Sequence, residues 1–227
     1  MTLEELFAAY YVLYRTEAET PNSEDDEFVI FKGLAKEAIH RWANYDGGFW
    51  KELYQTLQRE NDGDMVTVLG QTAYATPENM RKAGGFIRLY DTNGVTQARV
   101  PIVEPQDVQF ITEYSNFCYF VGDPNNGFEL NFSVEPVDSW VGLSMDYVYY
   151  KKPTELTKAK SVPEMSQPYF IVHRALANRF RGSRNPYYQS AKNDAEDVLR
   201  TMKLEGDSGN WADPWKLADN SAGRFGL

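Results

Sequence analysis

The hydrophobic positions of this chain follow two periods, and the longer period comes first. After Thr2 and again after Ser23, apolar residues recur every three or four positions, which places them on one face of a helix. Each of these two residues is followed three positions later by a carboxylate (Glu5 and Asp26), which is the spacing of a capping box. The sequence therefore predicts two amphipathic helices, followed by a short helix over residues 49–58.

The same longer period returns near the C-terminus. Ser166 can cap a helix that ends before Gly182. Asn185 and Pro186 then supply the N-cap and the first-turn proline of another helix, which Gly206 closes. Helices with complementary apolar faces are expected to pack together, so the sequence predicts one four-helix bundle.

Between these helical stretches the period shortens toward two, and the turns contain Gly, Asn and Asp. Alternating apolar residues favour strands, and glycine supplies the positive φ that tight hairpins need. The predicted hairpin turns are residues 92–94 and 123–127, and residues 105–111 are predicted to form a brief helix. The predicted strands cover residues 65–69, 86–90, 95–103, 117–121, 128–134 and 141–150. Short strands with local hairpins predict a small antiparallel sandwich or barrel with an aromatic-rich core.

The order of these segments predicts an α+β fold in which one domain is interrupted by another. The predicted architecture is a four-helix bundle formed by the N- and C-terminal segments, with an inserted small antiparallel β-sandwich or barrel. Its parts are the N-terminal part of the bundle (1–61), the inserted β module (62–156), the C-terminal part of the bundle (157–205) and an extended docking tail (206–227). A chain of 227 residues can bury a substantial core.

The chain is acidic. It carries 23 Lys and Arg against 33 Asp and Glu, a formal net charge of −10, and its isoelectric point is about 4.8. This balance argues against tight, sequence-independent capture of nucleic acid. Continuous apolar runs of membrane-spanning length and a signal-peptide core are both missing from the sequence, which predicts a soluble protein made in the cytoplasm and no membrane partner.

Side chains that catalysis or metal binding would require are sparse. His40 and His173 are the only histidines, and each lies in a predicted helix without neighbouring ligands at metal-binding spacing. Cys118 is the one cysteine, and its aromatic neighbours predict a buried strand position. The acidic run at residues 24–27 complements a helix dipole, and residues 123–127 fit a hairpin turn better than a calcium loop. The sequence therefore predicts no enzyme activity, no cofactor and no metal.

Basic residues gather around the third predicted helix and the turn that follows it, although the chain as a whole is acidic. They are Arg174, Arg179, Arg181 and Arg184. Positive charge is stabilising at a helix C-terminus, which is one explanation of this cluster. The alternative is that the arginines face an acidic surface on a partner.

The tail after Gly206 is polar and glycine-rich, yet it contains large apolar side chains. They include Trp211, Trp215 and Phe225. Such a segment cannot build a core of its own, while exposing two tryptophans would be costly. We interpret it as a docking tail that becomes ordered on a neighbouring subunit; disorder, or packing on its own bundle, is the alternative.

Particular stretches of the chain resemble a known family. These are residues 34–44 (LAKEAIHRWAN), residues 145–156 (MDYVYYKKPTEL), the pair Pro168-Tyr169 that opens a helix pair, and residues 197–202 (DVLRTM) that close it. In order and pattern they resemble the head-to-tail adaptor proteins of tailed bacteriophages, the connector or head-completion ring beneath the portal. The resemblance covers most of residues 1–204, and the tail after Gly206 matches no motif.

The resemblance implies a non-enzymatic structural protein of the virion, assembled in the host cytoplasm and located at the head–tail interface. It would form a dodecameric ring between the portal protein and the tail-completion or tail tube proteins, and DNA would pass through without specific binding. Arg179, Arg181 and Arg184 are then the candidates for pairing with acidic portal residues. Trp211 and Trp215, with Phe225, are the candidate anchors on the portal or on a neighbouring subunit.

Two other classes of function stay open from the sequence. The aromatic β module could bind a carbohydrate or peptide, with Trp140 and Tyr149 as the residues that would stack on it. A hydrolase using dispersed acids such as Asp138 and Asp146 is the remaining possibility. A binding module would function as a monomer, whereas an adaptor would need a ring or a portal.

Overall fold

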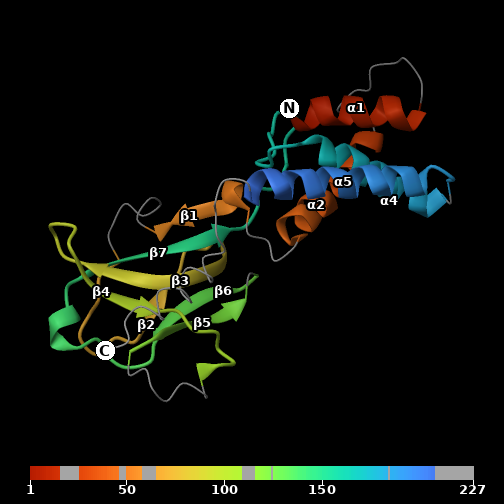
Figure 1. Cartoon of the computed structure of the whole chain (residues 1–227). Helices are drawn as coiled ribbons and strands as arrows, with labels where there is room; N and C mark the ends of the chain where they lie inside the picture. Colours follow the sequence, from red (N-terminus) through yellow and green to blue (C-terminus); the bar gives the residue numbers. More distant parts are fainter. Residues whose placement is uncertain are drawn as a thin grey trace. The chain divides into compact units, whose positions relative to one another are not determined.

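The structure is a computed structural model that describes residues 1–15, 26–45, 50–57, 65–108, 116–123, 125–183 and 185–207. The chain divides into two compact units. The helical unit combines Met1–Leu53 with the segment that begins at Pro153, and the β unit is Tyr54–Lys152 (Figure 1). These divisions come slightly before the sequence-based boundaries at residues 61 and 156. The chain is a mixed α+β protein, so the predicted fold class is confirmed at this level.

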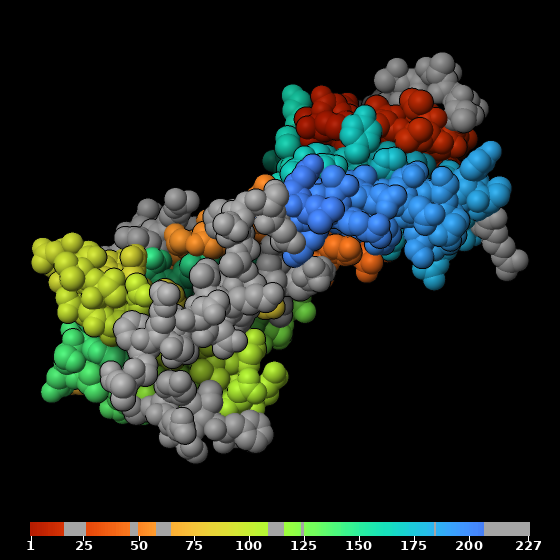
Figure 2. Space-filling view, in the orientation of Figure 1, coloured from red at the N-terminus to blue at the C-terminus, as the bar shows by residue number. Residues whose placement is uncertain are grey.

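Within the described ranges, the helical unit holds four α-helices. They are α1 (Leu3–Arg15), α2 (Asp26–Ala43), α4 (Tyr169–Ser183) and α5 (Tyr188–Asp207). Helix α4 packs against each of the other three, and the outer surfaces of α1 and α5 are both in view in Figure 2. None of the helices in the described ranges is long and apolar enough to cross a membrane.

Two of the predicted helix starts have the expected capping contacts. At α1, the Thr2 amide donates to Glu5 Oε2 at 2.8 Å and the Glu5 amide donates to Thr2 Oγ1 at 3.2 Å, which completes the capping box. Before α5, the Tyr187 amide donates to Asn185 Oδ1 at 2.9 Å. Ser23, which was expected to cap the second helix, lies outside the described residues.

Aromatic side chains fill much of the core of the helical unit. Phe7 of α1 lies edge-on to Phe28 of α2, with ring centroids 5.1 Å apart. The Tyr10 ring lies 4.9 Å from that of Phe31, and all four side chains are buried. At the other end of α2, Trp50 lies beyond the helix and caps it. Its indole N–H donates to the backbone carbonyl of Trp42 at 2.6 Å.

The short helix predicted over residues 49–58 is wrong. In the described part of this stretch, a single 3-10 turn (Lys51–Leu53) leads directly into β1 (Tyr54–Thr56). Strand β1 pairs with the distant β7, and the rings of Tyr54 and Tyr150 meet edge-on at 6.1 Å. An edge position on a sheet built from far along the chain overrides the local helical pattern.

The β unit contains two antiparallel sheets. The first has the strand order β1-β7-β3-β4 and the second has the order β2-β6-β5. The remaining strands are β2 (Ala73–Ala75), β3 (Met80–Tyr90), β4 (Thr96–Pro101), β5 (Cys118–Asp123), β6 (Gly127–Phe132) and β7 (Ser144–Lys151). Both sheets contribute to one buried cluster, for example through Ile87 and Tyr147 from the first and Leu130 and Phe132 from the second.

Several strand predictions need correction. Residues 65–69 contribute only an isolated bridge from Val66 to Ser144, and the buried Thr67 hydroxyl bonds to the backbone of Trp140 and Leu143 instead. Strand β2 and the first half of β3 were not predicted. Strand β2 is only three residues long, and a pair of adjacent glycines, Gly84 and Gly85, lies inside β3 and favours a turn from sequence. The first part of the brief helix predicted over 105–111 forms a turn, and the rest lies outside the described residues.

Candidate docking surface at the end of α4

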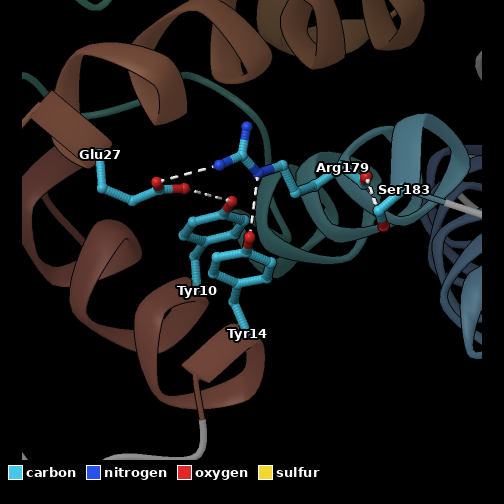
Figure 3. Close-up of polar contacts among 5 residues, drawn as sticks. All are labelled: Tyr10, Tyr14, Glu27, Arg179 and Ser183. Carbon is cyan, nitrogen blue, oxygen red and sulfur yellow. Dashed lines mark hydrogen bonds and ion pairs between the residues drawn. The ribbon is translucent and has the colours of Figure 1, made fainter. Parts of the chain in front are cut away.

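Two of the arginines that the sequence singles out, Arg179 and Arg181, lie in the last turns of α4, and Arg179 lies where three helices meet. Tyr10 and Tyr14 are one turn apart on α1, and their rings stack at 5.6 Å. Glu27 lies in the first turn of α2. Figure 3 shows these side chains converging on the Arg179 guanidinium. Helix periodicity therefore places two phenols, a carboxylate and a guanidinium at one end of the helical unit.

An ion pair, two hydrogen bonds and a cation–π contact link these four side chains. Arg179 Nη2 lies 3.1 Å from Glu27 Oε2, and Arg179 Nε donates to the Tyr14 hydroxyl at 3.4 Å. The Tyr10 hydroxyl donates to the other Glu27 oxygen at 3.1 Å. Arg179 Cζ also lies 5.3 Å from the centre of the Tyr14 ring, within cation–π range. Glu27 thus joins α1 to α4 through both of its oxygens.

Partial burial makes this ion pair more than a surface contact. The side chains of Arg179 and Glu27 are 32% and 11% exposed. Burial, and then the Glu27 carboxylate, raise the pKa of Tyr10 well above its ordinary value, so this phenol stays protonated and keeps donating. The hydrogen bond to Tyr14 raises the pKa of Arg179 further, so the guanidinium is always charged. The network therefore fixes α4 against α1 and α2.

A second arginine of the predicted basic cluster is also paired within the chain. Arg174 Nη1 lies 3.9 Å from Glu196 Oε1 of α5, and Arg41 Nη2 of α2 lies 3.3 Å from the same oxygen. Three helices are again joined through one carboxylate. Neither Glu27 nor Glu196 is close in sequence to its arginine, so no local pattern in the sequence indicates these pairings.

The predicted contact residues therefore separate into different groups. Arg179 is neutralised within its own helical unit, whereas Arg181, two positions further along α4, is exposed. Gly182 and Ser183 beside it are exposed as well. Arg184, Trp211, Trp215 and Phe225 lie outside the described residues. Among the described arginines of this set, Arg181 is therefore the one that is exposed at the end of α4.

The residues named for a ligand-binding β module do not form a stacking platform. Tyr149 is fully buried, with its hydroxyl 3.3 Å from Asn79 Oδ1, so its predicted exposure to a sugar is wrong. The half-buried Trp140 packs against the β core. These rings serve the interior of the β unit.

The acids and the nucleophile considered for catalysis have structural neighbours. Asp146 Oδ2 lies 2.9 Å from Arg88 Nη2 of the adjacent strand, which makes it half of a cross-strand ion pair. Asp138 begins a 3-10 turn (Asp138–Trp140). Cys118 is buried as predicted, and burial raises the pKa of its thiol far above the ordinary value. A thiol in this state is a packing residue and a poor nucleophile.

The two histidines lie on the helices where the sequence placed them. His40 is exposed on α2, and His173 of α4 is half-buried with its ring 6.5 Å from that of Tyr169. Across the described ranges, His, Cys, Asp and Glu residues form no group of three that could hold a metal ion.

Comparison with known proteins does not add a relative to this picture. No protein-family model matches the sequence, and no curated protein matches it.

Proposed function

We propose that this protein is a structural subunit of the ring that connects the head of a tailed bacteriophage to its tail. In the virion a dodecameric ring would sit between the portal protein and the tail-completion or tail tube proteins. One observation carries the proposal: the chain segments on both sides of a β unit of about a hundred residues contribute to one helical unit. The sequence resemblance to head-to-tail adaptors has this same order.

The segments that resemble the family lie at structurally important places. Residues 34–44 end α2, and residues 197–202 belong to the last helix, α5. Residues 145–156 cover most of β7 and the return of the chain into the helical unit at Pro153. The resemblance therefore involves both units and one of the two passages between them.

In this proposal the helices act as a four-helix bundle and the two sheets as a small sandwich. Helix α4, packed against α1, α2 and α5, would be the central element of the bundle. The shared cluster that includes Ile87 and Phe132 would be the sandwich core. The bundle would form the body of the ring and contact the portal, and the β unit would pack between subunits or face later tail components.

The acidic charge supports a channel function. A subunit with a net charge of −10, repeated around a ring, would surround DNA with negative charge. Repulsion between like charges keeps a polyanion from adhering to the wall while it slides. Weak affinity for DNA is then part of the function.

Exposed apolar side chains on the helical unit support assembly. Val12 and Leu13 of α1 are 54% and 51% exposed, and Val29 and Ile30 of α2 are 63% and 39% exposed. Side chains of this type lose contact with water when subunits meet. Repeated head-to-tail contacts that close on themselves produce a ring.

The docking contact is assigned to the end of α4 and the tail. Arg179 would position α4, whereas the exposed Arg181, together with Arg184 and the tail residues Trp211, Trp215 and Phe225, would meet the portal or a neighbouring subunit. Arginine and tryptophan are the residue types that dominate interface hot spots.

The direct test is light scattering of the protein mixed with the portal of the same genome, with each component measured alone. We expect many copies to co-migrate with the portal ring. Deleting the tail after Gly206 should abolish or strongly weaken this complex. If the intact chain and the portal stay separate at micromolar concentration, the adaptor proposal loses its basis.

A matched pair of charge reversals tests the docking contact itself. Arg181→Glu should weaken portal binding, because it removes a cation from the proposed contact and inserts a like charge. Lys160→Glu makes the same change at an exposed position close to the N-terminal end of α1, where Glu4 bonds to Ala159, and should leave binding intact. Equal binding by both variants would return Arg181 to a role in capping its own helix.

A further inference from the structure

The β unit has a cleft where β4 leaves β3. Strand β7 pairs with β3 from Met80 to Tyr90, whereas β4 pairs with it only from Phe86. At Gly85, which has a φ of 86°, the chain after β4 turns away: the Ile102 amide still donates to the Gly85 carbonyl, but the Val103 amide donates to Cys118. The divergence leaves a cleft of about 230 Å³ beside the start of β3.

The walls of the cleft combine apolar and charged side chains. Its apolar residues include Met80, Ile102, Phe120 and Phe128. Arg81 and Lys82 supply positive charge and Glu104 supplies one negative charge. Burial lowers the pKa of Arg81, which means that the surroundings disfavour its charge. Positive side chains at the wall of a cleft favour a ligand that carries a carboxylate.

The size of the cleft favours one kind of ligand. Pockets for small molecules usually measure about 300–1,000 Å³, so about 230 Å³ is small for a metabolite or a sugar chain. It matches one or two large side chains of a peptide. Aromatic walls beside positive side chains favour a peptide in which an aromatic residue lies close to a carboxylate.

We propose that this cleft receives residues 211–215 of a neighbouring copy of the same chain, an inference that rests on the proposed ring. In an extended segment, residues two positions apart share a face. Trp211, Asp213 and Trp215 therefore present two indoles with a carboxylate between them. This face complements the aromatic walls of the cleft and the cations Arg81 and Lys82.

Pro214 fits the same arrangement. It falls on the alternate positions of the segment, together with Ala212 and Lys216, so its missing N–H points away from the side on which the other residues could hydrogen-bond. Lys216, on the same alternate positions, is then directed toward solvent. Both the side-chain order and the backbone chemistry of the tail are thus compatible with an extended peptide in the cleft.

The length of chain limits where the neighbouring copy can be. The described chain ends at Asp207, and four extended residues span at most about 14 Å to Trp211. Adjacent subunits would therefore hold the end of α5 close to the next cleft. Each tail would leave one subunit and enter another in the same direction, which is a contact that closes into a ring.

Disulfide trapping in the full chain tests this contact. The variant Asp213→Cys with Lys82→Cys should form a ladder of covalent oligomers under mild oxidation at high protein concentration, read on a non-reducing gel. The native Cys118 is buried and does not compete. The matched control is Asp213→Cys with Thr96→Cys, because Thr96 is exposed at the far end of β3 and β4. Thermal unfolding of both variants confirms that they are folded.

The outcomes separate clearly. A ladder from the Lys82 variant and none from the Thr96 variant supports exchange of tails. Equal cross-linking of both variants, or no cross-linking of either, overturns the cleft as the receptor, and a disulfide confined to single chains overturns exchange between copies. The assay contains no portal, so portal binding without a ladder would sink this inference alone, and a ladder without portal binding would sink the adaptor proposal alone.

Discussion

Glu27 and Arg179 are 152 residues apart in the chain, yet their side chains meet at 3.1 Å. The pair joins the first turn of α2 to the last turns of α4, and therefore joins the part of the chain before the β insertion to the part after it. Tyr10 donates to the other Glu27 oxygen, and Tyr14 accepts from Arg179 Nε. Arg179, which the sequence assigns to a contact with a partner, is thus paired within its own chain.

Removing the arginine of this ion pair should destabilise the helical unit. Arg179→Ala leaves the Glu27 carboxylate, only 11% exposed, without its cation, and we expect a loss of about 1–3 kcal/mol in the free energy of unfolding. Urea denaturation followed by circular dichroism measures it. Arg181→Ala, at an exposed position, should change stability by no more than about 0.5 kcal/mol. Similar losses in both variants would contradict an internal role for Arg179.

A pair of glycine substitutions tests the β5–β6 hairpin. Gly122 and Gly94 both have positive φ, so alanine at either position costs about 1 kcal/mol of conformational energy. A Cβ at Gly122 would also lie 2.2 Å from the Gly127 carbonyl oxygen, whereas a Cβ at Gly94 meets nothing within 4 Å. Gly122→Ala should therefore lose about 1–3 kcal/mol more than Gly94→Ala in thermal or urea unfolding. Equal losses would show that the hairpin relaxes freely.

The buried hydroxyl of Thr67 should matter more than its size indicates. Its single O–H has the carbonyls of Trp140 and Leu143 within reach as acceptors, and its oxygen accepts from the Leu143 amide. Thr67→Val keeps the shape but removes the side-chain hydrogen bonds. The two carbonyls and the Leu143 amide keep their backbone partners, so we expect a loss of about 0.5–1.5 kcal/mol. The control is Thr96→Val on exposed β4, which should be neutral within about 0.5 kcal/mol. Urea denaturation of both variants decides between them.

Alkaline pH should destabilise the protein in two stages. Burial raises the pKa of Cys118 and of Tyr10 above their ordinary values of 9.0 and 10.0, so the folded chain keeps protons that the unfolded chain releases. Stability is therefore complete below about pH 9 and falls as pH rises, by up to about 1.4 kcal/mol per pH unit for each group. Urea unfolding at several pH values measures this slope.

Cys118→Ala separates the two stages. The substitution lowers stability at every pH because it removes buried volume, but the fall between pH 9 and 10 should become shallower than in the parent chain. An unchanged slope would mean that the thiol already ionises in the folded protein. Labelling of the parent chain with a thiol reagent gives the same comparison, since reaction should be slow until denaturant is added.

The sequence predicted best where chemistry is local. The Thr2–Glu5 box and the Asn185 cap lie within three residues of the groups they satisfy, so spacing alone identifies them. Cys118 was expected to be buried because its neighbours in the strand are aromatic, and it is. Helices α1 and α5 begin close to these local signals.

Prediction failed where a distant partner decides the outcome. Residues 54–56 form a strand because β7 lies beside them, and no residue near Tyr54 carries that information. Tyr149 is of a residue type that is common on binding surfaces, but it lies in the core shared by two sheets. Arg179 fits a helix C-terminus or an interface equally well from sequence, and only the fold brings Glu27 to it.

The β unit begins with β1 and ends with β7, and these strands are direct neighbours, with Tyr54 opposite Tyr150. The points where the chain enters and leaves the unit are therefore separated by about one strand spacing, roughly 5 Å. A linker of a few residues could close that gap, so the helical unit could accept a shorter or a wholly different β cassette without changing its own packing. Recombination between related genes could exchange the insertion as a single piece, while Glu27 and Arg179 keep the two parts of the helical unit paired.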